Sequence, residues 1–131
     1  MKKILFIAIA ILIGIVANAQ ERASLTLVNK SDYTMTIKLM KSTYSSDSLH
    51  ATITLRPRQS QMLYFGHTAT YYTKTKAEKT LSPTVYKKGD KFSIYCGRDG
   101  YSEAILEFYL SSSGGGSMGQ SISKAEFEKN N

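Results

Sequence analysis

Apolar and polar residues alternate along most of this chain, between residues 24 and 111. The pattern is clearest over residues 51–55, where the apolar members are Ala51, Ile53 and Leu55. A period of two is typical of a β-strand that is buried on one face. Pro57 then ends the run, because proline has no amide hydrogen to donate to a sheet and fixes its own φ angle. The alternation therefore predicts strands and argues against long helices.

About seven such runs follow one another at intervals of about ten residues, without a helical pattern between them. This spacing predicts an all-β fold, a small antiparallel β-sandwich of two packed sheets, with a small closed barrel as the alternative. The rhythm of residues 25–29, residues 35–39 and the turn at Pro57 resembles that of immunoglobulin-like (Ig-like) sandwiches, a likeness that implies no functional site. The runs over residues 92–96 and 104–110 flank a glycine-containing turn, and we expect them to pair with each other.

The chain begins with the features of a secretory signal peptide. Lys2 and Lys3 precede a small and apolar run of 14 residues, and small residues at Ala17 and Ala19 fit a cleavage site. As a helix this run would measure about 21 Å, which is short for a hydrocarbon core of about 30 Å. We therefore expect residues 1–19 to be removed during export from a bacterial cell, to the periplasm or the outside. An uncleaved membrane anchor is the alternative.

The rest of the chain divides into a domain, a linker and a tail. Residues 20–111 have the length of one domain with its own core. Residues 112–121 begin with a run of serine and glycine, which predicts a flexible linker. In residues 122–131, Ser123 and Glu126 have the spacing of a capping box, which predicts a short helix. A helix this short is marginal alone, so we expect either a frayed tail or a tethered peptide that docks Ile122 and Phe127 on this domain or on a partner.

Motifs for catalysis or metal binding are nearly absent from the sequence. His50 and His67 are the two histidines, and neither has the spacing of a metal site. Cys96 is the single cysteine, so no intramolecular disulfide is possible, and no histidine follows it as a blue-copper site requires. Glu103 and Glu107 share the outward phase of the last run and fit a solvated strand face better than a glycosidase pair. We expect no cofactor and no enzymatic activity.

A basic, tyrosine-bearing segment over residues 71–91 is the strongest functional feature. The formal net charge of the chain is +7, and this segment concentrates lysines with few acidic residues between them. Lysine attracts phosphate, sulfate or carboxylate groups, and tyrosine offers a flat ring with a polar tip. The predicted ligand-binding residues are Tyr71, Tyr72, Lys74, Lys76, Lys87 and Lys88. Lysines that only keep an exposed strand soluble are the alternative interpretation.

These features predict an exported, non-enzymatic binding or scaffold module of the bacterial cell envelope. The partner would be an anionic glycan, a lipid headgroup or an acidic protein surface, and not nucleic acid. Two alternatives stay open. One is a subunit that assembles through sheet edges or through the C-terminal tail. The other is a hydrolase without a recognisable motif, in which His50 or His67 would act as the base.

Overall fold

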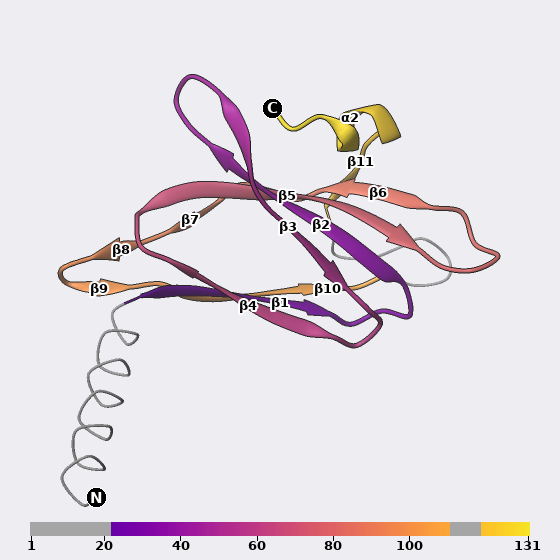
Figure 1. The fold of residues 1–131 in the computed structure, drawn as a ribbon, viewed down its shortest axis with the longest axis horizontal. Coiled ribbons are helices and arrows are strands. Elements are labelled where there is room, and N and C mark those ends of the chain that lie inside the picture. The colour runs from indigo at the N-terminus through magenta and orange to yellow at the C-terminus, as the bar shows by residue number, and fades with distance from the viewer. Residues whose placement is uncertain (1–21, 111–118) are drawn as a thin grey trace, which may run out of the picture.

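A computed structural model describes residues 22–110 and 119–131 and confirms the all-β sandwich (Figure 1). Two sheets lie face to face, and one buried apolar cluster takes side chains from both of them. The proposed signal peptide and most of the proposed linker lie outside the described residues.

The smaller sheet has three strands in the order β10 (Glu103–Phe108), β1 (Ala23–Asn29) and β4 (Ser60–Phe65). β1 is the central strand. It runs antiparallel to β4 and parallel to β10, with Ser24 opposite Glu103. The first strand and the last long strand of the sandwich are thus hydrogen-bonded neighbours.

The larger sheet has six strands and carries the C-terminal tail at one edge. Its order is β11 (Gln120–Ser121), β6 (Val85–Lys88), β5 (Ala69–Glu78), β2 (Thr34–Ser42) and β3 (Asp47–Leu55). The sixth strand, β7 (Phe92–Ile94), pairs with the beginning of β5, while β6 pairs with its later part. β5 and β2 therefore form the centre of this sheet.

The expected pairing of the runs over residues 92–96 and 104–110 is wrong. β7 belongs to the larger sheet and β10 to the smaller one. Between them the chain forms a minimal hairpin of β8 (Cys96–Gly97) and β9 (Gly100–Tyr101), at the turn that the glycines predict. The hairpin is local, and it carries the chain from one sheet to the other instead of joining two long strands.

The alternating residues point into the core as the sequence predicts. Side chains that are at most 4 % exposed include Leu25, Leu27, Met35, Ile37, Leu39, Ile53 and Leu55. Phe108 and Leu110 close the same cluster from the end of the chain's last long strand. β3 ends at Leu55, and the turn after it places Arg58 at φ 66°, as expected for a chain that leaves the sheet at Pro57.

Asn29 fixes the turn between β1 and β2. Its side chain is fully buried, and Nδ2 donates hydrogen bonds to the carbonyl oxygens of Tyr33, Leu55 and Arg56 at 2.7–3.2 Å. Its Oδ1 accepts hydrogen bonds from the amide and the hydroxyl of Ser31. One side chain thus joins the first turn to the end of β3, where backbone groups would otherwise lack partners.

The C-terminal tail returns to the sandwich. Gln120 and Ser121, which the sequence assigns to the linker, form β11 and pair with β6. The predicted short helix is α2 (Lys124–Glu128), and the Ser123 side chain caps it by accepting from the Glu126 amide at 3.1 Å. In Figure 1, α2 lies on the side of the larger sheet that faces away from the smaller one. Across the residues that the structure describes, no helix has the length and apolarity to span a membrane.

Candidate functional site

The outer face of the larger sheet gathers lysines from three adjacent strands. Strand register places Lys38 of β2 beside Lys74 of β5, and Lys74 beside Lys88 of β6. Lys76 lies two residues along β5 on the same side. We call these four lysines, Lys38, Lys74, Lys76 and Lys88, the basic face. Tyr72 and Tyr86 share this side of the sheet.

The structure brings together four of the six predicted ligand-binding residues and separates the other two. Tyr72, Lys74, Lys76 and Lys88 lie on the outer side of the sheet. Tyr71 points the opposite way, into the core, where its ring centroid is 5.1 Å from that of Phe65.

Lys87 also lies on the side opposite Lys88. Its Nζ donates to the Ser121 hydroxyl at 3.0 Å, at the edge of the sheet. Tyr71 and Lys87 are therefore removed from the candidate site, because successive residues of a strand point to opposite faces.

Lys74 is the centre of the basic face and is completely buried. Its Nζ donates to the carbonyl oxygens of Glu126 and Lys129 at 2.9 and 3.0 Å, and the Glu126 carboxylate lies 3.6 Å away. The carbonyl groups at the C-terminal end of a helix lack partners within the helix and carry partial negative charge. The sheet therefore supplies the cation that the last turn of α2 does not contain.

Lys38 binds the same end of α2. Its Nζ donates to the Phe127 carbonyl oxygen and to Asn130 Oδ1, both at 2.9 Å. Burial lowers the pKa of Lys38 below its usual value, the nearby Lys74 and Lys76 add to this, and Glu128 opposes it. Lys38 and Lys74 thus both donate hydrogen bonds to carbonyl oxygens at the C-terminal end of α2.

Phe127 anchors the tail on the basic face. Its side chain is 5 % exposed, and its ring centroid is 5.5 Å from that of Tyr86. Lys38 Nζ lies 4.7 Å from the centre of the Phe127 ring, and Lys76 Nζ lies 5.9 Å from it, which are cation–π distances. The tail thus contributes an aromatic ring as well as carbonyl and carboxylate oxygens.

Tyr72 closes the other end of this surface. Its hydroxyl donates to the Asp47 carboxylate at 2.8 Å, and Lys88 Nζ lies 5.1 Å from the ring centre. Burial, together with the hydrogen bond to Asp47, raises the pKa of Tyr72 to about 12. The same hydrogen bond lowers the pKa of Asp47. Tyr72 therefore stays protonated and serves as a donor over the whole physiological pH range.

Gly119 allows the tail to approach β6. Its φ is 97°, and a Cβ at this position would collide with the Lys88 carbonyl oxygen. Just beyond it, the Ile122 amide donates to the Tyr86 carbonyl oxygen at 3.0 Å, which continues the pairing of β11 with β6. Glycine is thus required where the chain turns onto the edge of the sheet.

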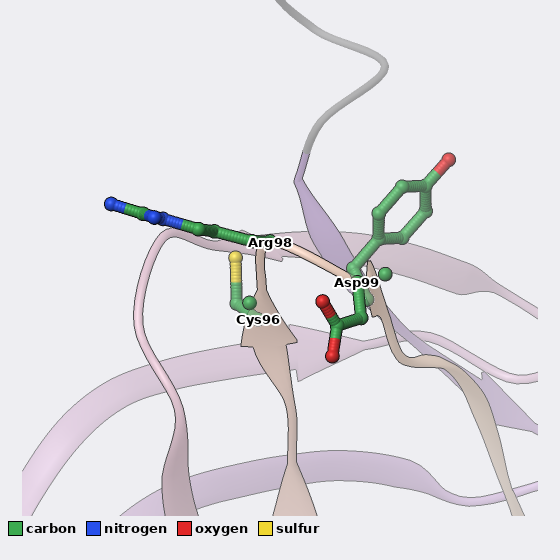
Figure 2. Close-up of a pocket in the computed structure, with 6 residues that line it drawn as sticks. Cys96, Arg98 and Asp99 are labelled. Atoms are coloured by element: carbon green, nitrogen blue, oxygen red, sulfur yellow. The ribbon is translucent and has the colours of Figure 1, made fainter.

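A hollow at the β8–β9 hairpin offers less chemistry than the basic face. Cys96, Arg98, Asp99 and Tyr101 are among its lining residues. Figure 2 shows the Arg98 guanidinium and the Asp99 carboxylate on opposite sides of Cys96, so these groups do not converge on one point in this view. Within residues 22–110 and 119–131, no three His, Cys, Asp or Glu side chains are grouped so that they would hold a metal ion.

His50 and Glu107, two other candidates for chemistry, are in structural contacts. The His50 ring stacks on Phe65 at 5.5 Å and meets the edge of Tyr71 at 5.2 Å. Glu107 forms an ion pair with Lys30 at 3.2 Å on the outer side of β10, in the outward phase that the sequence predicts.

Sequence reasoning allowed the tail to dock on this domain through Ile122 and Phe127, but it did not include Lys38 in the site and did not place the tail on the basic face. Lys38 is recognisable from the sequence as an outward-facing residue of its strand, but its place beside Lys74 depends on the register between β2 and β5. For Phe127, the sequence signal is its spacing from Ile122 around the helix cap at Ser123, which fits a hydrophobic staple. No family profile matches this chain, and a search of curated proteins finds no relative.

Proposed function

We propose that this protein is an exported, non-enzymatic β-sandwich that binds an acidic protein segment on its basic face. In this proposal, residues 119–131 are a displaceable cover of the binding site. The signal-peptide features of residues 1–19 support export, and the charge of the basic face supports an anionic partner.

The burial of Lys74 is the observation that carries the proposal. Removing an ammonium group from water is costly, and apolar residues of similar size often serve a permanently covered position equally well or better. Lys38, Lys76 and Lys88 add like charges around it, which repel one another. A buried lysine cluster of this kind is explained if residues 119–131 detach and an anionic partner binds in their place.

The contacts of the tail favour a peptide over a glycan or a lipid headgroup. The lysines of the basic face donate hydrogen bonds to backbone carbonyl oxygens of the tail and also contact the Glu126 carboxylate and the Phe127 ring. The edge of β6 receives backbone hydrogen bonds from an added strand. Strand addition at a sheet edge with side-chain pockets beside it is an established way to bind peptides.

The test compares binding to variants of the full chain. The probes are a fluorescent acidic peptide with one phenylalanine, an anionic polysaccharide, and vesicles that contain phosphatidylglycerol, each at about 50 and about 500 mM salt. We expect the peptide to bind at low salt and more tightly to Phe127→Ala, because the apparent affinity rises with the fraction of molecules whose site is open.

The matched controls are Lys88→Glu on the basic face and Arg98→Glu on the distant β8–β9 hairpin, which change the charge equally. Weaker binding to Lys88→Glu alone supports the proposal. Equal binding to both variants, or no peptide binding to Phe127→Ala at low salt, refutes it. Binding of only the polysaccharide or only the vesicles refutes the choice of a peptide partner.

A further inference from the structure

We infer that residues 119–131 are exchanged between two copies of this chain, so that the tail of each copy covers the basic face of the other. The inference rests on the proposed function insofar as both need the tail to leave its own basic face. It goes further by naming a second occupant of the basic face besides an acidic segment, the tail of another copy of this chain.

The covered edge of β6 is the first reason. Pairing with β11 covers the edge of β6, which would otherwise present backbone groups to other chains. The segment that fits this edge, with Ile122 bonded to Tyr86 and Phe127 against its ring, is present in every copy. Each molecule therefore carries both halves of the same contact.

The connection between the two halves is the second reason. Residues 111–118 join Leu110 to Gly119 and consist mostly of serine and glycine. Eight residues span at most about 26–29 Å when fully extended. Residues 119–131 themselves make the hydrogen bonds and ion pairs with the larger sheet that are described above, so the tail of a second copy makes the same contacts.

The geometry at Gly119 adds a third reason. The positive φ and the close approach to the Lys88 carbonyl oxygen show that the chain must turn sharply to reach β6. Exchange of a terminal segment through a connecting loop keeps every contact and adds only the cost of association, and reciprocal exchange closes into a symmetric dimer. If residues 111–118 behave as the flexible linker that their serine and glycine content predicts, the effective concentration of the tethered tail is of the order of millimolar, and exchange becomes populated as the protein approaches that concentration.

Residues 87 and 121 allow a direct test. They lie opposite each other in the β6–β11 pairing, and Lys87 Nζ reaches the Ser121 hydroxyl at 3.0 Å. The Ile122 amide is bonded to the Tyr86 carbonyl oxygen, so residues 86 and 122 form a hydrogen-bonded pair. Because the two kinds of pair alternate along antiparallel strands, residues 87 and 121 form a non-hydrogen-bonded pair. Side chains are closest in such pairs, which suits a disulfide.

The experiment uses full chains that carry Cys96→Ser. One protein has Lys87→Cys, the other has Ser121→Cys, and the two are mixed at about 1 mM, diluted and oxidised at once. Non-reducing electrophoresis measures the cross-linked heterodimer. A parallel mixture of Lys87→Cys with Ser48→Cys, an exposed position on β3, measures random collisions.

We expect at least a tenfold excess of heterodimer over the collision control. A chain with both Lys87→Cys and Ser121→Cys serves as the reference and should close within itself at low concentration. If the reference closes and the mixture gives no excess, exchange is refuted while the covered basic face stands. If the reference does not close, the docking of the tail itself is wrong, and both the exchange and the proposed cover are overturned.

Discussion

Replacement of Phe127 by alanine should release the tail without unfolding the sandwich. Phe127 is the buried apolar residue of α2, and its contacts are with Tyr86 and with lysines of the outer face, outside the main core. Burial of a phenylalanine side chain stabilises by about 1.5–3 kcal/mol, and an aromatic pair adds about 0.5–1.5 kcal/mol. The docked tail should therefore lose about 2–4 kcal/mol.

Amide hydrogen exchange is the appropriate assay, because it reports the opening of single segments. The Ile122 amide, bonded to the Tyr86 carbonyl oxygen, is the reporter of the tail. A loss of about 2–4 kcal/mol corresponds to about 30- to 700-fold faster exchange, up to the rate of an unprotected amide. Amides of β1 and β2 should keep their protection, since the core does not include Phe127.

Phe127→Leu is the matched control. Leucine keeps most of the apolar burial and loses the ring contacts with Tyr86 and the lysines, so exchange at Ile122 should rise by only about 2- to 12-fold. The reasoning fails if Phe127→Ala leaves the Ile122 amide protected. It also fails if amides of β1 and β2 lose as much protection as Ile122, because the tail would then belong to the same folding unit as the core.

Three further predictions concern the sandwich itself. Asn29→Ala should destabilise the fold by about 3 kcal/mol, because buried carbonyl groups lose their donor, and a lower midpoint in urea unfolding would show it. Partial desolvation beside two aromatic rings, together with the nearby charge of Lys41, lowers the pKa of the otherwise exposed His50, so the unfolded chain binds the proton more readily than the folded one. Stability should therefore fall as the pH drops below about 6.5 and level off below the folded pKa, more in the natural chain and in His67→Gln than in His50→Gln. In an alkaline absorbance titration, Tyr72→Phe should remove the tyrosine that ionises near pH 12, and Asp47→Asn should shift that ionisation to lower pH; a Tyr72→Phe difference curve centred near pH 10 would contradict the burial argument.

Much of the fold could be predicted because the alternation is a local signal. A residue such as Ile37 or Ile53 shows its inward direction through its immediate neighbours. Strand partners are a different matter. The runs around Phe92 and Leu106 look like the arms of one hairpin, yet they belong to different sheets, because pairing depends on packing between residues far apart in the chain.

The candidate site could be predicted only in part for the same reason. A group of residues chosen because they are close in the sequence includes both faces of a strand. The predicted site therefore contains Tyr71 as well as Tyr72, although the alternation alone separates them. Lys38 could not be predicted as part of the site. Its position next to Lys74 depends on the register between β2 and β5, which the sequence does not reveal. The sequence predicts the helix cap at Ser123, but it does not show on which surface Phe127 packs.

The parallel pairing of β1 with β10 has a consequence for the order of folding. β1 is the central strand of its sheet, and its partner β10 is among the last strands that leave the ribosome. While the chain emerges from its N-terminus, β1 has no complete sheet to join, and long-range pairing of this kind forms slowly. The sandwich can close only after β10 has emerged, so its core stays incomplete until nearly all of the chain has been synthesised.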